Sequence, residues 1–211
     1  MRSAPIGLLF SHDIPRLVEV ARAVAISTHG HPTALASSIA AAAAVGFVLN
    51  EAPPEGLTDH LVEVLNRERG TPHFIERESH DPLQEQTQLL KKLGAVLALP
   101  PEQAFDEIGG GWVGEETVAG ALYCFLRTPN DFRATVLTAA NACMSDTQAR
   151  NRGRCDSDSI ACVAGAIAGA YLGIRAIPAE WIEMIENRDL LFDLGKKLAA
   201  KASGELARTQ S

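Results

Sequence analysis

Residues 155–173 read CDSDSIACVAGAIAGAYLG, two acids followed by a nearly uncharged run of small residues. Within this run Ala161, Gly165, Gly169 and Gly173 recur every four residues, and residues four apart share one face of a helix. A glycine inside a helix costs roughly 1 kcal/mol relative to alanine. A row that repeats it therefore predicts a helix whose backbone is closely approached by a neighbouring helix.

Asp156 and Asp158 stand where the chain would enter this helix, each followed by a serine. Asp and Ser are common helix caps, because their side-chain oxygens accept hydrogen bonds from free N–H groups of the first turn. A cap needs one acceptor, so capping explains one acid better than two. Carboxylates one residue apart can also converge on Mg²⁺ or Ca²⁺. The spacing alone favours capping, whereas mounting on a closely packed helix suits a metal site.

The totals describe one helical domain over residues 1–211. The chain has 211 residues, of which 46% are hydrophobic and 5% aromatic, enough for a single core. Apolar residues recur at helical spacing and few stretches alternate as strands do, so we expect an all-α, orthogonal multi-helix bundle. Pro32 opens a run to Leu49 that is apolar almost all round and should be central. Further helices are expected after an N-cap at Asp13 and at about 57–68, 83–99, 115–127, 131–144 with Asn130 as N-cap, 158–173, 179–186 and 189–202. The tail from residue 202 is expected to be frayed.

Charge, cysteines and apolar runs limit the partners and the compartment. The net charge of −7 argues against nucleic acid, which favours a basic face. The four cysteines form no C-x-x-C pair, so reduced thiols are expected. The apolar runs 35–49 and 160–172 are shorter than the roughly 20 residues that cross a bilayer. With no signal-peptide pattern at the start, we expect a cytoplasmic protein without a membrane partner.

Four stretches together resemble one known family. They are MRSAPIG (1–7), ISTHGHPTALASSIAAA (26–42), GGGWVGEETVAGALYCFL (109–126) and DSDSIACVAGAIAGAYLG (156–173). In this order they are similar to the end of the phosphate loop, the T-H-x-x-P segment, the glycine loop with its following helix, and the C-terminal metal signature of the ADP-ribosylglycohydrolases. These are the relatives of the dinitrogenase-reductase-activating glycohydrolase.

The resemblance implies an all-helical enzyme that hydrolyses an ADP-ribosyl glycosidic bond on a modified protein side chain or a small adduct. It implies a pair of Mg²⁺ ions at the scissile bond. Matched by position, the metal ligands are Asp156, Asp158 and Ser159, and the ligand-binding residues are Met1, Arg2, His29, Gly109, Gly110, Gly111 and Trp112. The resemblance assigns no catalytic acid or base.

The sequence departs from the family pattern in two places. It matches the C-terminal two-thirds of the family domain and lacks the first metal motif, so at most one metal site is expected to be complete. Residues 144–154 form an apparent insertion, and Arg154 and Cys155 stand in place of the usual glycines before the acidic pair. A truncated, non-catalytic remnant is therefore the alternative, one that binds ADP-ribose weakly or serves as a helical interaction module.

Other polar residues have simpler interpretations. His73, Glu76, Glu78, His80 and Asp81 are expected to form a solvated loop, because no pair of histidines shares a helix face. Trp112 can pack or stack on adenine. The adjacent acids at 115 and 116 are expected to favour the start of a helix electrostatically.

Overall fold

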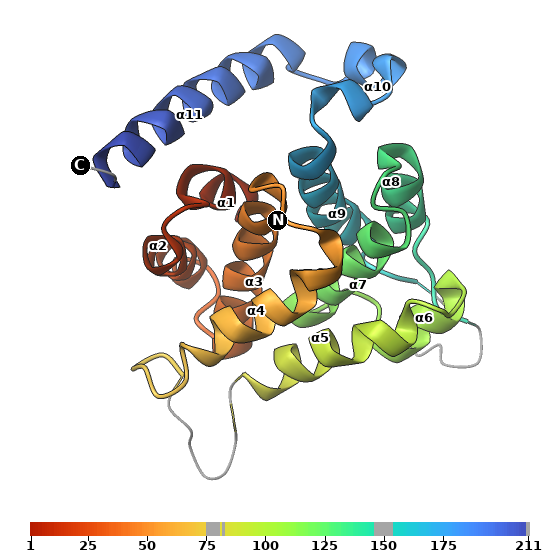
Figure 1. Ribbon diagram of the computed structural model, residues 1–211. Helices are drawn as coiled ribbons and strands as arrows, with labels where there is room; N and C mark the ends of the chain where they lie inside the picture. Colours follow the sequence, from red (N-terminus) through yellow and green to blue (C-terminus); the bar gives the residue numbers. More distant parts are fainter. Residues whose placement is uncertain (75–80, 82, 146–153, 210–211) are drawn as a thin grey trace.

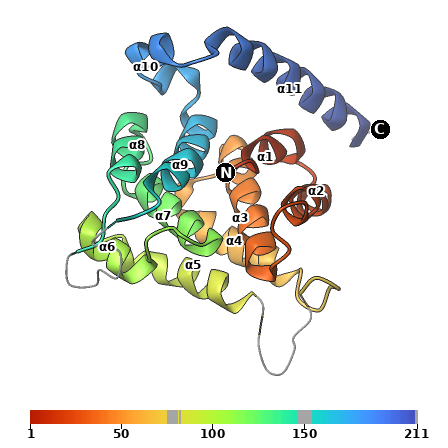
Figure 2. The same cartoon turned by 180° about the vertical axis from the view of Figure 1, so that it is seen from behind.

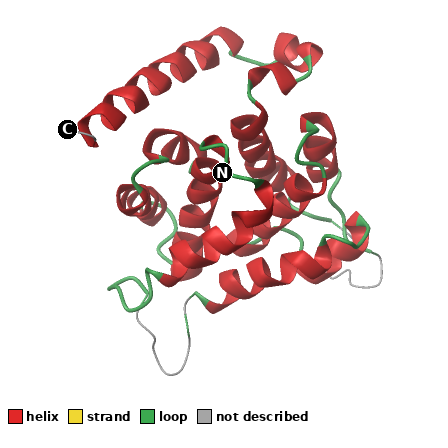
Figure 3. Cartoon of the chain, viewed as in Figure 1, coloured by secondary structure: helices red, strands yellow, loops and turns green. Residues whose placement is uncertain are grey.

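The computed structural model describes residues 1–74, 81, 83–145 and 154–209, with side chains to residue 204. Within those ranges the chain forms eleven α-helices, two short 3-10 helices and no strand (Figure 3). The all-α prediction is confirmed. The candidate histidine and acid loop falls largely in 75–80, outside the described residues, as do residues 146–153 of the insertion.

The helix order places three long helices at the centre. The α-helices are α1 (Ala4–Phe10), α2 (Ile14–Ile26), α3 (Pro32–Leu49), α4 (Leu57–Asn66), α5 (Gln84–Val96), α6 (Pro101–Ile108), α7 (Gly114–Arg127), α8 (Phe132–Ala140), α9 (Ser157–Leu172), α10 (Ala179–Met184) and α11 (Arg188–Thr209), with 3-10 turns at Pro54–Gly56 and Ile174–Ala176. Helices α3, α7 and α9 lie in the interior, and α4, α5 and α6 cover one end (Figures 1 and 2). Helix α11 lies along the opposite side of the molecule.

Helix α3 is the centre of the core, as its composition predicts. It is long and apolar enough to cross a membrane by length and composition alone, yet 72% of it is buried inside the protein. Its Leu35 and Ile39 pack into the same apolar cluster as Leu122 of α7 and Ile160 and Ile167 of α9. Burying such a side chain contributes about 1.5–3 kcal/mol, so these contacts fix the three helices that surround the site.

Helix α8 packs closely along α9, as the row of small residues predicts. A Cβ on Gly165 would lie 3.6 Å from Val136 Cγ2, and one on Gly169 would lie 3.8 Å from Phe132 Cε2, both ordinary contacts. Gly173 ends α9 with a φ of +73°, a conformation that glycine adopts at helix ends. The close packing is therefore confirmed, but it does not require glycine at these positions.

Gly7 of α1 makes a close contact that does require glycine. A Cβ there would lie 2.2 Å from the carbonyl oxygen of Ala42 in α3 and 2.9 Å from Val45 Cβ. The two backbones approach so closely that only glycine fits at this crossing. The crossing fixes the N-terminal residues of the chain against the middle of α3.

Local signals set several helix ends. Asp13 caps α2 as its position suggests, its carboxylate accepting a hydrogen bond from the N–H of Arg16 at 3.0 Å. Asp131, and not the preceding asparagine, caps α8 by accepting from the N–H of Ala134 at 2.9 Å. That helix ends at Ala140, four residues before its predicted end. Helix α11 continues to Thr209, beyond the predicted frayed tail.

Candidate functional site

A cavity of about 700 Å³ opens where five helices meet. It is lined by the N-terminal residues before α1, the end of α2 and the loop that follows, one face of α3, and the first turns of α5, α7 and α9. Among the predicted site residues, its wall includes Met1, Arg2, His29, Trp112 and Ser159. Residues from opposite ends of the sequence thus share one hollow.

One wall of the cavity carries the cationic and imidazole groups. The Arg2 guanidinium donates a hydrogen bond to Thr28 Oγ1, and His29 Nδ1 lies 2.8 Å from the same hydroxyl. Thr28 therefore holds both side chains on one side of the hollow. The break between α2 and α3 at THGHP provides this arrangement, because the loop after α2 turns back beside the N-terminus.

The glycine loop packs beneath α9. The Asp156 N–H donates to the Gly110 carbonyl at 2.7 Å. Gly111 has a φ of +81°, and a Cβ there would lie 2.8 Å from Ile160 Cδ1. Gly109 also has a positive φ, of +107°. These three glycines do not line the cavity wall among the described residues; they support the turn that presents Trp112, whose indole is 57% exposed.

Glu116 fixes this loop, a role that the sequence did not reveal. Its Oε2 accepts hydrogen bonds from the N–H groups of Gly111 at 3.0 Å and Trp112 at 3.2 Å. Thr117 adds a bond from its hydroxyl to the Gly111 carbonyl at 2.8 Å. The sequence gives one signal for this role, an acid a few residues after a run of glycines. An acid at this position is explained equally well by its favourable interaction with the start of a helix.

The acidic pair lies at the start of α9 beside the cavity. Asp156 occupies the N-cap position, but its side chain makes no cap hydrogen bond. It is half-buried, Asp158 in the first turn is exposed, and Ser159 is 8% exposed. Ser159 lines the cavity, whereas neither aspartate belongs to the described lining residues. The spacing favoured capping for one of these acids, but the Asp156 carboxylate does not cap the helix.

The donor chemistry at this helix start fits a hard cation, since two carboxylates and a hydroxyl stand within four consecutive residues. A full protein ligand set is not formed, because no group of three or more His, Cys, Asp or Glu side chains within the described residues is arranged to hold a metal ion. These three residues would therefore contribute part of a metal site, in keeping with the single partial motif in the sequence.

A second acidic pair lines the cavity and escaped the sequence analysis as a pair. Glu85 begins α5 and accepts a hydrogen bond from Thr33 Oγ1 at 3.2 Å. Glu115 begins α7, and burial raises the pKa of its carboxyl, with further contributions from Glu85 and Glu116. Only the folding of α5 against α7 brings these distant glutamates together.

The insertion before α9 is closed at its base. Cys143 and Arg154 form an antiparallel bridge, and the backbone N–H of Ser145 donates to Asp106 Oδ1 at 3.0 Å. The chain therefore leaves α8, returns at residue 154 and enters α9 directly. The bridge carries the acidic pair back to the edge of the glycine loop.

Comparison with known proteins shows the family of the chain. The ADP-ribosylglycohydrolase family model matches residues 1–207, so the chain belongs to the ADP-ribosylglycohydrolase family. It is 30% identical over 214 residues to ADP-ribosylhydrolase ARH3 of Xenopus tropicalis, covering 94% of this chain and 58% of that protein.

Two further relatives show how much of a family protein the chain represents. It is 29% identical to human ADP-ribosylhydrolase ARH3, covering 89% of this chain and 53% of that protein. It is 26% identical to the ADP-ribosylarginine hydrolase Tri1 of Serratia proteamaculans, covering 97% and 46%. The chain thus spans about half the length of the curated relatives it matches.

Proposed function

We propose that this chain forms part of an enzyme that hydrolyses the glycosidic bond between ADP-ribose and a protein side chain or small adduct, with Mg²⁺ as cofactor. The observation that carries the proposal is the shared cavity, where Arg2 and His29 from the start of the chain meet Trp112 and Ser159. The names of the relatives, ADP-ribosylhydrolase and ADP-ribosylarginine hydrolase, support this substrate class.

The cavity offers groups that suit the parts of ADP-ribose. The Arg2 guanidinium is a planar, permanently charged donor that matches phosphate oxygens, and His29 stands beside it. The exposed indole of Trp112 offers an aromatic face on which adenine could stack. The Arg2 cation and the Trp112 indole, both on the cavity wall, would together orient the nucleotide.

The start of α9 would supply the reacting end of the site. Asp156, Asp158 and Ser159 are the residues that would hold Mg²⁺, which when bound activates water and fixes ribose hydroxyls. Cleavage at the anomeric carbon develops positive charge on the sugar. Carboxylates at the helix start would offset this charge, while the packing of the glycine loop beneath α9 keeps their backbone in place.

The direct test is release of ADP-ribose from arginine- and serine-modified peptides, with Mg²⁺ and with EDTA. Asp158→Ala should abolish metal-dependent release and the heat of Mg²⁺ binding in calorimetry. Asp59→Ala is the matched control, because Asp59 is also an acid in the first turn of a helix. Turnover that persists in EDTA would contradict the metal role.

The second candidate is a non-catalytic module that binds ADP-ribose weakly. It is favoured by the partial metal ligand set within the described residues. Calorimetry with ADP-ribose separates the two functions, since binding without turnover in a folded sample supports the module and excludes the enzyme for this chain.

The compartment and the excluded partners also stay proposals. We propose a cytoplasmic protein that acts without nucleic acid or membrane, and the four free cysteines are compatible with a reducing compartment. Burial raises the pKa of Cys124 to about 12, so this thiol stays protonated and unreactive at neutral pH.

A further inference from the structure

Helix α11 is almost uncovered despite its length. It runs from Arg188 to Thr209, and every side chain described between 188 and 204 is exposed except the half-buried Leu198 and Ala202. These two lie toward the end of the helix that contacts α1. The rest of α11 extends along the outside of the bundle toward α10 (Figure 1).

The apolar face of α11 continues beyond the part that is covered. Leu191, Leu194, Leu198 and Ala202 follow one another at intervals of three, four and four residues, so they share one face of the helix. The last two are half-buried, whereas Leu191 is 49% and Leu194 is 51% exposed. One continuous apolar stripe is therefore covered by α1 at one end and open at the other.

Neighbouring residues enlarge the open end into a surface. We define the α10–α11 apolar surface as the exposed large hydrophobic residues in this part of the chain: Met184, Ile185, Leu190, Leu191, Phe192 and Leu194. Single exposed hydrophobics are common on soluble proteins, but six large ones within residues 184–194 indicate an interaction site. Half of the helix thus lacks the packing partner that its sequence requires.

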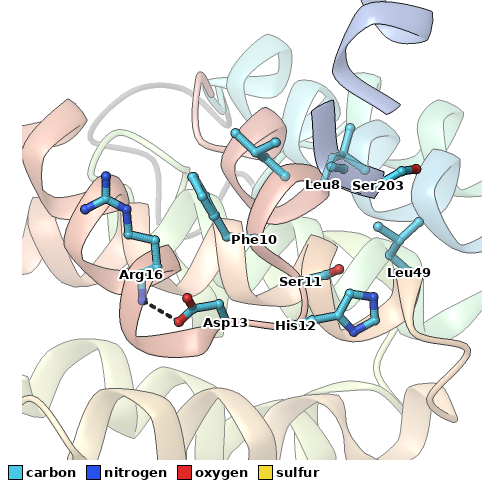
Figure 4. A pocket seen from close by; sticks show the side chains of 10 residues that line it. Leu8, Phe10, Ser11, His12, Asp13, Arg16, Leu49 and Ser203 are labelled. Carbon is cyan, nitrogen blue, oxygen red and sulfur yellow. Dashed lines mark hydrogen bonds between the residues drawn. The ribbon is translucent and has the colours of Figure 1, made fainter. Parts of the chain in front are cut away.

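The covered end of α11 is itself incompletely packed. Figure 4 shows Ser203 of α11 near Leu8 and Leu49, around a hollow of about 180 Å³ that is also lined by Phe10 and Ala202. Helix α1 contacts α11 extensively at this end, whereas the side chains of α11 from Arg188 to Lys197 are exposed.

We propose that the α10–α11 apolar surface docks the part of the ADP-ribosylglycohydrolase fold that the relatives possess and these 211 residues do not. The family match extends to residue 207, so α10 and α11 belong to the family domain and are no appendage. The chain covers only 58% and 53% of the frog and human relatives, which leaves nearly half a family protein as the occupant.

The surroundings of the stripe favour a protein domain over an anionic membrane. On the described part of this helix Arg188 pairs with Asp189 and Lys197 pairs with Asp193, which leaves Lys196 and Lys201 as the further basic residues. The polar side of the helix is therefore of mixed charge. Membrane-binding helices instead carry a basic polar face. The proposal rests on family membership and exposure, and it holds whether or not the chain is catalytic.

Co-expression tests the proposal without requiring activity. The 211-residue chain is co-expressed with a tagged polypeptide comprising the part of Xenopus tropicalis ARH3 outside the matched region. The two should co-purify as a one-to-one complex. Leu194→Glu should lower the recovered complex by about tenfold or more. Ala200→Glu, the same substitution at an exposed position off the stripe, should lower it less than about twofold.

Two measurements make every outcome decisive. Circular dichroism and the melting temperature of each variant alone should match the parent chain, because both positions are exposed. Sedimentation velocity of the chain alone should show a monomer. Failure of the folded chain to form the complex, or a complex unaffected by Leu194→Glu, would overturn the proposal. A dimer of the chain alone that Leu194→Glu dissociates would assign the surface to a second copy instead.

Discussion

The glycines of α9 lie in a row of small residues, whereas the glycine at the α1–α3 crossing stands alone between Ile6 and Leu8, and the two kinds of position differ in what they do. Gly165 and Gly169 have room for a Cβ at ordinary contact distance, whereas a Cβ on Gly7 would overlap the Ala42 carbonyl at 2.2 Å. The prediction was based on the periodic glycines of α9, whereas Gly7 makes the closest contact. Recurrence of glycine along a closely packed helix therefore does not by itself mean that glycine is required there; the facing atoms decide it.

Gly7→Ala should have the largest effect on stability. The new methyl group would force α1 away from α3, and overpacking of this kind costs about 1–3 kcal/mol or more. Urea unfolding followed by circular dichroism should show a free energy of unfolding lower by about 3 kcal/mol. An unchanged midpoint would mean that the two helices are free to separate without cost.

Gly111→Ala should be the next most damaging change. The residue has a φ of +81° and its Cβ would lie 2.8 Å from Ile160 Cδ1, so strain and overlap together should cost about 2 kcal/mol. Binding of ADP-ribose, measured by calorimetry, should weaken as well because the loop presents Trp112. Gly70→Ala provides the control: it has a φ of +78° with nothing within 4 Å, so it reports backbone strain alone.

Glu116→Gln should lower the free energy of unfolding by about 1 kcal/mol. The carboxylate accepts two backbone N–H groups of the glycine loop, and hydrogen bonds to charged groups are stronger than neutral ones. Thermal and urea denaturation measure the loss. If the variant is as stable as the parent chain, the hydrogen bonds from Glu116 to the glycine loop do not stabilise the fold.

Gly165→Ala should act in the opposite direction. Its Cβ would meet Val136 Cγ2 at 3.6 Å, and replacing a glycine inside a helix by alanine stabilises by about 0.5–1 kcal/mol. Gly94→Ala in α5, where nothing lies within 4 Å of the added Cβ, measures helix propensity alone. A clear loss at Gly165 with a gain at Gly94 would show that the packing of α9 does require glycine there.

Glu115→Gln should change the free energy of unfolding in the opposite direction to Glu116→Gln, and by the smallest amount of these substitutions. Burial raises the pKa of Glu115, so its ionised form opposes folding above the ordinary carboxyl pKa. Glu115→Gln should therefore raise the free energy of unfolding at pH 7. The gain should vanish near pH 3, well below the ordinary carboxyl pKa, where the parent residue is protonated in both the folded and the unfolded state. Urea titrations at the two pH values measure it; a gain that persists at low pH would contradict the ionic explanation.

Patterns local to a helix predicted most of the fold. The proline-opened run from Pro32 to Leu49 and the cap at Asp13 are read from neighbouring residues, because apolar spacing and first-turn acceptors act within a few positions. Helices α1 and α6, of seven and eight residues, were not expected, because so short a helix displays little of a period; the six-residue α10 was predicted all the same.

Residues of the candidate site were predictable only where they match a motif of the family. Arg2, His29, Trp112 and Ser159 were named from the resemblance and line one cavity. The pairing of Glu85 with Glu115 was not, because residues thirty positions apart meet only through the contact of α5 with α7. The hydrogen bonds from the glycine loop to Glu116 likewise depend on the geometry of the turn, which the sequence pattern does not reveal.

The sequence by itself determined that this protein is helical, that α3 is its central helix, and that acids and small residues stand at the entry to α9. These properties follow from interactions between residues close along the chain. The tertiary structure alone decided that Gly7 and not the α9 glycines permits the tight crossing, that the Asp156 carboxylate makes no cap bond, and that half of α11 stays uncovered. Each of these depends on which atoms from distant segments face one another, and packing fixes that only once the whole chain has folded.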